Sequence, residues 1–479
     1  MKKNIFKIGT VAALLLGVTI SGCNKLSDFG DTNVNPGATT EPVLSALLTN
    51  VEAGIAGYAS QTLPGLYAQY ISETQYTDAS LYSINQANFT GIYQGNLYDL
   101  QNIIIRNESQ NMTNVAKILQ QYIFWTVTDR WGDIPYSEAL QGTTPKYDTQ
   151  EEVYKGMIAT LSEVVDQFDG SPISGDVIFG GDVAKWRKTA NSLRMLMAIQ
   201  LSERFPAAGG YAATEFNSAL SHSAGYISSN EDNFLVPFPG GNFKNTWWSL
   251  YDGREDFGQS NTMTGLTSSL SDTRQQVFGG ETKVEGQDNS NNTSNIGVPY
   301  GWTRAKTEAW TSANPKWARV LRGDKRTQSS PIYIITAAQV TLARAEAANL
   351  GWTSENLVNV YNAGIRQSFE QWGLTPAASY FTQSGVAITP GGANNERNIA
   401  IQRYIASYPD GLQGWNIWRK SGYPVLQPAA DATSTIKEIP TRFMYHPSEY
   451  TTNEVNVREA ESRLQGGNIM TARVWWDVD

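Results

Sequence analysis

The sequence predicts a mainly α fold, in which helical hairpins form a single body around a loop-rich region. Apolar residues recur at intervals of three and four over much of the chain, which places them on one face of a helix. Short connections between these stretches allow consecutive helices to pack as hairpins. This periodicity fades between residues 207 and 331, where glycine, asparagine, serine and aromatic residues dominate.

One helix, which we call the central helix, is expected to organise the body, and it ends near Trp131. Gly132 loosens the backbone, and Pro135 disfavours the helical conformation at the residue before it, so an ordered turn is predicted to follow. The chain then returns to a helical pattern. Asp148 and Glu151 have the spacing of a capping box, and we predict that this next helix opens there.

Four further helices are predicted in the first half of the chain. Apolar patterns indicate helices over 43–55, 63–71 and 92–105, with residues 76–88 as a loop between the second and the third. The stretch from Trp186 to Leu201 is apolar around most of its circumference, so it predicts the most buried helix. We therefore assign residues 43–206 to helical hairpins.

A second helical block is predicted over residues 332–420. Residues 336–349 and 357–372 form two helical patterns joined by a short loop, and this arrangement resembles a tetratricopeptide unit. Between the two blocks, residues 207–331 are expected to be irregular, and such long regions are usually functional or disordered. Their tryptophans argue against disorder and against a pure interaction scaffold, which would not need them. We expect ligand binding in this region.

The first residues have the pattern of a secretory signal peptide that ends in a lipobox. Two lysines precede an apolar run from Val11 to Ile20, and Cys23 follows small residues. Cys23 is the only cysteine, so a disulfide within the chain is excluded. We predict that residues 1–22 are removed, that Cys23 is lipidated and that residues 23–42 form a tether.

The composition argues against several kinds of function. The formal net charge is -9, and there is no cluster of lysine or arginine, so nucleic-acid binding is not expected. His222 and His446 are the only histidines, which leaves almost nothing to build a histidine metal cluster or a Ser-His-Asp triad. We expect no metal and no cofactor.

Several motifs resemble those of the SusD/RagB family of outer-membrane nutrient-binding lipoproteins. The first, at the end of the central helix, is Trp131-Gly-Asp-Ile-Pro-Tyr-Ser-Glu-Ala139. Later motifs are Leu342-Ala-Arg-Ala-Glu-Ala-Ala348, Gly414-Trp-Asn-Ile-Trp-Arg419, Ile439-Pro-Thr-Arg-Phe443 and Arg473-Val-Trp-Trp-Asp477. No motif of the family is found in residues 207–331, so the resemblance does not fix the ligand.

The resemblance implies a cell-surface protein that binds nutrients. Its fold would be a helical body with tetratricopeptide-like hairpins, and its lipid anchor would lie in the outer membrane and face the cell exterior. Its partner would be a SusC-like, TonB-dependent transporter, over which the lipoprotein closes as a lid. A glycan, as an oligosaccharide or polysaccharide, is the preferred ligand, and RagB-type relatives suggest peptides as the alternative.

Aromatic residues outside regular helical patterns are the candidates for ligand contact. Sugar rings present C–H faces that stack on indole and phenol rings, while nearby polar side chains bind the hydroxyl groups. The candidate ligand-binding residues are Trp247, Trp248, Trp302, Trp310, Tyr76 and Tyr82. The tryptophans on helices or at their ends, Trp125, Trp131, Trp186, Trp415 and Trp418, are instead expected in the core.

A helical glycoside hydrolase is the enzymatic alternative. Such enzymes need two carboxyl groups about 5 to 9.5 Å apart. The available sets are Asp129 with Asp133, and Asp252 with Glu255 and Asp256. We expect the first pair to cap the turn and tie it to Arg130, and the second set to bind ligand hydroxyls. No catalytic residue is assigned, and the chain is not expected to be an enzyme.

Overall fold

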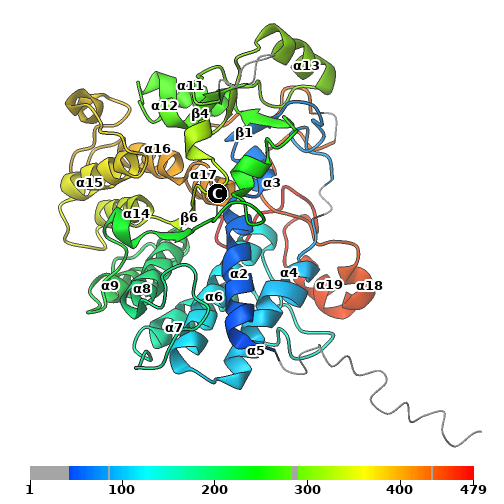
Figure 1. Ribbon diagram of the computed structural model, residues 1–479, viewed down its shortest axis with the longest axis vertical. Coiled ribbons are helices and arrows are strands. Elements are labelled where there is room, and N and C mark those ends of the chain that lie inside the picture. The colour runs from blue at the N-terminus through cyan, green and yellow to red at the C-terminus, as the bar shows by residue number, and fades with distance from the viewer. Residues whose placement is uncertain (1–41, 85–86, 283–289, 433–434, 479) are drawn as a thin grey trace, which may run out of the picture. The chain divides into compact units, whose positions relative to one another are not determined.

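The computed structural model describes residues 42–84, 87–282, 290–432 and 435–478 (Figure 1). The chain divides into two units, Met1–Val43 and Leu44–Asp479. The predicted signal peptide, Cys23 and all of the tether except Pro42 lie outside the described residues. Within the described ranges, no helix is both long enough and apolar enough to cross a bilayer.

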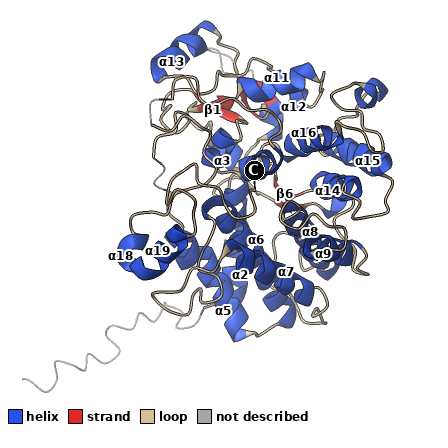
Figure 2. Ribbon diagram, turned by 180° about the vertical axis from the view of Figure 1, so that it is seen from behind, coloured by secondary structure: helices blue, strands red, loops and turns tan. Residues whose placement is uncertain are grey.

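The unit Leu44–Asp479 is mainly α, as the sequence predicted, and Figure 2 shows only short strands among the helices. The helices outside residues 207–331 are α2 (Leu44–Ala59), α3 (Thr62–Tyr67), α4 (Thr90–Ile92), the π-helix η2 (Tyr93–Leu97), α5 (Tyr98–Arg106), α6 (Gln110–Trp131), α7 (Gln150–Val164), α8 (Val183–Gln200), α14 (Ala337–Asn349), α15 (Leu357–Glu370), the 3-10 helix η5 (Ala378–Thr382), α16 (Asn395–Ser407), α17 (Gly411–Ser421), α18 (Glu449–Thr452) and α19 (Glu454–Ser462).

Consecutive helices of this unit pack against each other in pairs. The pairs α6 and α7, α14 and α15, and α16 and α17 are each joined by one connection and lie side by side, and α14 also packs on α8 and α16 (Figure 1). Each helix thereby buries its apolar face on the next one. The predicted series of tetratricopeptide-like hairpins is confirmed.

The central helix α6 ends where the sequence predicted. Gly132 follows Trp131 with a φ of +87°, a conformation that suits glycine, and its amide donates to the Thr128 carbonyl oxygen. Ser109 caps the other end, because its side chain accepts a hydrogen bond from the Met112 amide. Nearly the whole circumference of α6 is buried, so the helix lies inside the body.

The predicted capping box of the next helix is displaced by one residue. Thr149 and Glu152 form it, and α7 starts at Gln150. Asp148 serves the preceding turn instead, because its carboxylate accepts hydrogen bonds from the amides of Tyr136 at 3.1 Å and Ser137 at 2.7 Å. Asp148 therefore satisfies two amides of the turn with one carboxylate.

Helix α8 is buried as predicted. Asp182 caps its start, and Trp186 is fully buried with its indole N–H 2.8 Å from an Asp176 oxygen. The other helical tryptophans also agree with the prediction: Trp125, Trp131 and Trp415 are buried, and Trp418 is partly buried against the core.

Residues 207–331 contain more regular structure than the sequence predicted. They include α9 (Tyr211–Leu220), the 3-10 helix η3 (Asn230–Asp232), α10 (Thr246–Ser249), α11 (Asn261–Ser269), α12 (Gln275–Phe278), α13 (Arg304–Ala313) and the 3-10 helix η4 (Gly323–Lys325). Helix α9 packs on α8, so it extends the series of hairpins past residue 206. Outside these helices the region is built from loops and strands.

Among the described residues there are three two-stranded antiparallel sheets, and two of them join this region to segments outside it. They pair β1 (Ile71–Glu73) with β3 (Phe257–Gln259), β2 (Phe234–Val236) with β6 (Ile332–Ile335), and β4 (Gly279–Glu281) with β5 (Ala318–Val320). The helix predicted over 63–71 therefore ends at Tyr67. Ile71, the last residue of the predicted range, is the first residue of β1. The pairing of β1 with β3 places the loop after β1 beside the central region of the chain.

Helices α3 and α17 meet backbone to backbone. A Cβ atom on Gly411 would lie 2.2 Å from the Gly65 nitrogen, and this is closer than real atoms approach. Glycine is therefore required at this crossing, because any side chain would push the two helices apart.

Candidate functional site

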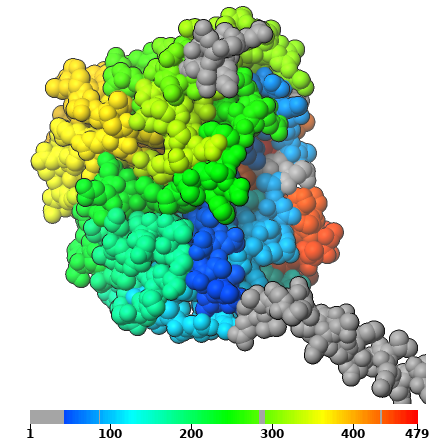
Figure 3. Space-filling model, viewed as in Figure 1, coloured from blue at the N-terminus to red at the C-terminus, as the bar shows by residue number. Residues whose placement is uncertain are grey.

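Three segments from distant parts of the sequence meet at one surface of the unit: residues 74–84, 300–313 and 427–431. Tyr82 in the first segment accepts a hydrogen bond from the Ala429 amide in the third. The Asp431 amide in the third donates to the Gly301 carbonyl oxygen in the second. In Figure 3 the blue atoms of the early chain lie next to the green atoms near α13 at this surface. We call it the aromatic surface.

Asp431 holds the start of α13 in place. Its carboxylate accepts hydrogen bonds from the Thr303 amide at 3.0 Å and the Lys306 ammonium at 2.6 Å. These two donors hold the pKa of Asp431 below its ordinary value, the lysine contributing more. Gly301, with a φ of +67°, lets the turn pass close to Ala429, because a Cβ there would lie 2.5 Å from the Ala429 Cα. The turn before α13 is thus fixed by the third segment.

Glu73 fixes the loop that begins the first segment. The Glu73 carboxylate, at the end of β1, accepts hydrogen bonds from the Ser80 amide at 2.9 Å and the Ser80 hydroxyl at 2.7 Å. Burial raises the pKa of Glu73, although the two bonds from Ser80 oppose this rise. The loop between these residues is therefore short and anchored at both ends, and it presents Tyr76 to solvent.

Tyr76 is the most exposed of the six candidate aromatic residues, with 56% of its surface accessible. The Arg304 guanidinium lies 5.3 Å from the centre of its ring, which is a cation–π contact between the first and second segments. Trp302 is half-buried in the turn two residues before Arg304. Trp302 lies close in the chain to the contact between Arg304 and Tyr76, so we retain both aromatic residues as candidates.

Four charged groups of the aromatic surface form two ion pairs, and Asp78 of the first segment is exposed beside them. Arg304 forms an ion pair with Glu308 at 2.7 Å, and Lys306 forms one with Asp431 at 2.6 Å. Two cations and two anions leave no net charge among these four groups. Sequence reasoning missed Arg304, Lys306 and Glu308 because helix α13 itself was not predicted, and it missed Asp431 because its contacts are with a distant segment. The only available signal was the alternation of charged and small residues from Arg304 to Ala309.

Tyr82 is a core residue, contrary to the sequence prediction. Its side chain is fully buried, and its hydroxyl accepts the hydrogen bond from Ala429 at 2.8 Å. The burial raises the pKa of Tyr82, whereas the Ala429 amide and the Tyr300 hydroxyl oppose the rise. Tyr82 joins the three segments of the aromatic surface from beneath, so we do not retain it as a ligand contact.

Trp310 lies on α13 rather than on a loop. It is half-buried, six residues after Arg304. Six residues at 3.6 per turn rotate its side chain by roughly 120° away from the face that carries Arg304. Trp310 therefore belongs to the same helix as the aromatic surface but not to the face next to Tyr76.

Trp248 is half-buried in α10. The Lys244 ammonium lies 4.5 Å from the centre of its ring. The chain that follows α10 approaches the first segment of the aromatic surface, because the Thr74 amide donates to the Asp256 carbonyl oxygen at 2.8 Å. Trp248 thus stays a candidate near the edge of the aromatic surface.

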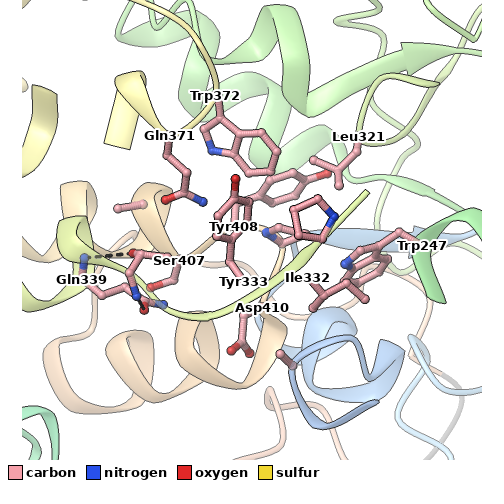
Figure 4. A pocket seen from close by; sticks show the side chains of 15 residues that line it. Trp247, Leu321, Ile332, Tyr333, Gln339, Gln371, Trp372, Ser407, Tyr408 and Asp410 are labelled. Carbon is pink, nitrogen blue, oxygen red and sulfur yellow. Dashed lines mark hydrogen bonds between the residues drawn. The ribbon is translucent and has the colours of Figure 1, made fainter. Parts of the chain in front are cut away.

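Trp247, its neighbour, is buried in the core with 4% of its surface accessible. Figure 4 shows it in the wall of a small pocket, opposite the rings of Tyr333, Trp372 and Tyr408. The accessible space in this pocket is about 20 Å³, enough for roughly one water molecule and far too small for a sugar ring. We therefore reassign Trp247 from ligand contact to core packing.

Comparison with known proteins identifies the family. Residues 36–446 match the SusD-like family described as "Starch-binding associating with outer membrane". The chain belongs to the SusD-like family. The family association with the outer membrane agrees with the resemblance found in the sequence motifs. Among curated proteins, no sequence matches the chain.

Solved structures of similar proteins have the same fold. A chitin-binding protein matches with a TM-score of 0.78 and 25% identity, over 91% of this chain and 100% of its own. A SusD homologue from Bacteroides uniformis matches with a TM-score of 0.76 and 25% identity, over 92% and 100%. A chitin-binding SusD homologue from Flavobacterium johnsoniae, 23% identical, matches with a TM-score of 0.77 over 91% and 99%.

The first carboxylate pair of this SusD-like protein is part of its core. Asp129 is fully buried and accepts hydrogen bonds from Tyr154 at 2.5 Å, Trp476 at 3.0 Å and Asn416. Burial raises the pKa of Asp129 to about 6. With every oxygen bound and no exposed surface, Asp129 has no access to a substrate.

Asp133 also has a structural role, but its partner is not the predicted one. It binds Arg463 at 2.5 Å and the Gln150 amide at 2.8 Å, so it ties the turn to the start of α7 and to the region after α19. Arg130, which was expected to bind this pair, donates to Thr126 and Gln61 instead. The turn is therefore held by more distant parts of the chain than the sequence suggested.

The second carboxylate set lies on the loop between α10 and β3, and each member faces a cation. Asp252 lies 3.8 Å from the Lys244 ammonium, Asp256 lies 2.5 Å from Arg254, and Glu255 pairs with the buried Arg319. Within the described ranges, no group of three or more metal-ligating side chains is found. These contacts give the carboxylates structural partners, and no catalytic role is assigned to them.

Proposed function

We propose that this SusD-like protein binds a neutral glycan at the aromatic surface, with Tyr76 and Trp302 as stacking platforms. The contact between Tyr76 and Arg304 carries the proposal, because it exposes an aromatic ring that the chain has fixed in place. An exposed aromatic side chain held by its neighbours loses little conformational entropy when a ligand binds. The C–H face of a sugar ring is the ligand chemistry that such a platform suits.

The paired charges at the start of α13 suit a neutral polyhydroxylated ligand. Arg304, Lys306, Glu308 and Asp431 are paired, yet most of them keep exposed donors or acceptors. Such groups can bind hydroxyls without a net charge to be neutralised. The family description names starch, and the names of two structural relatives name chitin, which supports a glycan in preference to a peptide.

Binding measurements with single alanine variants test this proposal. Replacing Tyr76 with alanine is expected to weaken glycan binding by about 1 to 3 kcal/mol, because an exposed stacking ring is lost. Trp302→Ala is expected to act in the same direction. Isothermal titration with maltooligosaccharides and chitin oligosaccharides measures the affinity, and the melting temperature shows that each variant is folded.

Tyr98 provides the matched control, because it is a tyrosine on α5 with 53% of its surface exposed, close to the 56% of Tyr76. Tyr98→Ala is expected to bind as the parent does. Equal affinities of the parent, Tyr76→Ala and Trp302→Ala would place the site elsewhere, and Trp248 would be examined next.

We further propose that the protein is lipid-anchored at Cys23, faces the cell exterior and passes its glycan to a SusC-like, TonB-dependent transporter. The family association with the outer membrane and the lipobox at Cys23 support this role. A protein that concentrates a ligand for a transporter needs no catalytic group, in keeping with the binding proteins among its relatives.

Fatty-acid labelling in cells tests the anchor. Cys23→Ala removes the thiol to which the lipid would be attached, so labelling is expected to disappear and the protein to leave the membrane fraction. Cys23→Ser, which keeps the size of the side chain but lacks the thiol, serves as a second variant with the same expectation. Labelling that persists in both variants would rule out attachment at Cys23.

A further inference from the structure

A hollow lies between α11, α12 and residues 293–295, on a part of the molecule that the proposed stacking site does not use. Its volume is about 440 Å³, and it is open to solvent. A second hollow of about 230 Å³ continues it toward η5, and the two share Ser271 and Thr273. We call the two together the hydroxyl groove.

The walls of the hydroxyl groove are made of neutral polar side chains. Ser268, Ser271, Thr273, Gln276 and Asn295 are all exposed there. In the part of the chain that the structure describes, none of these five side chains forms a hydrogen bond with another residue. Their hydroxyl and amide groups can both donate and accept hydrogen bonds to a ligand, and none of them is charged.

The one charged group in the lining of the larger hollow is already neutralised. Asp272 forms an ion pair with Arg274 at 2.6 Å, and both side chains are fully buried. Tyr380 also donates a hydrogen bond to the Asp272 carboxylate at 2.6 Å. This buried cluster is a rigid floor for the groove. A charged ligand therefore finds no counter-charge in the larger hollow, whereas a neutral polyhydroxylated one finds many partners.

The backbone is strained where the two hollows meet. Ser271 has a φ of +49°, in the left-handed region that is uncommon for residues other than glycine, asparagine and aspartate. Such conformations persist only where the surroundings hold them, and they cluster at binding sites. Here the strain turns the chain so that Ser271 and Thr273 lie at the join of the groove.

The hydroxyl groove is close to the aromatic surface along the chain. Asn295 in the groove and Trp302 in the aromatic surface are seven residues apart, so they lie at most about 25 Å from each other. The segment between them is fixed, because the Val298 amide donates to Gln259 and the Val298 carbonyl oxygen accepts from Asn261. A long glycan therefore has the reach to contact both.

We propose that the hydroxyl groove is a second binding site for neutral glycans, which holds a long chain while its other part lies on the aromatic surface. This inference rests on the proposed function, since it assigns a second contact to the same ligand class. Two linked contacts raise the affinity for long glycans well above that for short ones, because the second contact forms at high effective concentration.

The test compares a groove variant with a matched control on a long probe and a short probe of each glycan. For starch these are soluble starch and maltotriose, and for chitin they are a long and a short oligosaccharide. The groove variant is Gln276→Ala with Asn295→Ala, and the control is Gln465→Ala with Asn394→Ala, which removes exposed residues of the same types outside the groove. The aromatic-surface variant Tyr76→Ala is measured beside them.

The groove variant is expected to bind the long probe about tenfold more weakly than the parent and the short probe equally well. The control is expected to match the parent on both probes, and Tyr76→Ala is expected to lose affinity for both. A groove variant that binds the long probe as tightly as the parent overturns the second site while the proposed function stands. A parent that binds none of these probes overturns both.

Discussion

Tyr76 and Tyr82 lie six residues apart in one loop, yet they have opposite environments. Tyr76 is exposed beneath a guanidinium, whereas Tyr82 is fully buried beneath the segment 427–431. Both lie between two helical patterns, so the local sequence does not distinguish their environments. The burial of Tyr82 depends on Tyr300 and Ala429, more than two hundred residues away, and such contacts leave no local pattern in a sequence.

Glu52 is a buried acid whose protonation should make stability depend on pH between about 4.5 and 9. It lies on α2 with no exposed surface, and the Val177 amide donates to one of its oxygens at 2.6 Å. Burial, and then the neighbouring charge of Asp176, raise the pKa of Glu52 from 4.5 to about 9. The folded protein therefore keeps this proton at neutral pH.

The pH dependence of unfolding tests this assignment. The folded pKa of Glu52 lies above the unfolded one, so its contribution to stability is fully present below about pH 4.5 and is lost as the pH rises toward 9. The parent is expected to lose free energy of unfolding across this range more steeply than Glu52→Gln, which has no proton to release. Chemical denaturation at several pH values measures both slopes, and equal slopes would contradict the raised pKa.

At the scale of elements, the long helices that bury a wide face were predicted, whereas the helices within residues 207–331 were missed. Helix α8 buries most of its residues, so its apolar pattern was plain in the sequence. Helix α13 buries only Thr307, so no apolar period marks it. Its start is set by Asp431 from another part of the chain, and this explains why the aromatic surface could be predicted only in part.

The crossing of α3 and α17 gives a prediction at this scale. Gly411→Ala would place a Cβ atom 2.2 Å from the Gly65 nitrogen, and backbone cannot move as a flexible side chain does. We expect the free energy of unfolding to fall by about 1 to 3 kcal/mol or more. Gly57→Ala in α2, where a Cβ meets nothing within 4 Å, is the control and is expected to leave stability unchanged or raised. Equal melting temperatures for the two variants would contradict the close approach.

At the scale of the whole unit, the helical hairpins act as a scaffold, and the site is formed by chain segments that they carry. The mainly α fold and the family followed from the sequence, because apolar periodicity and the motifs at Trp131 and Gly414 are local features. The assembly of residues 74–84, 300–313 and 427–431 did not follow, because it depends on strand pairing and single hydrogen bonds between distant residues. The exposed candidate residues could be distinguished from the buried ones only once the three-dimensional structure was known.

Hydrogen exchange with and without soluble starch tests the position of the glycan most directly. Binding at the aromatic surface is expected to slow exchange of backbone amides in residues 74–84, 300–313 and 427–431, because a bound ligand stabilises the segments it contacts against local opening. Helix α5, which carries the exposed Tyr98, should exchange at the same rate in both samples. Slowed exchange confined to the segments around Trp247 and the pocket of Figure 4, with none at the aromatic surface, would contradict the proposed site.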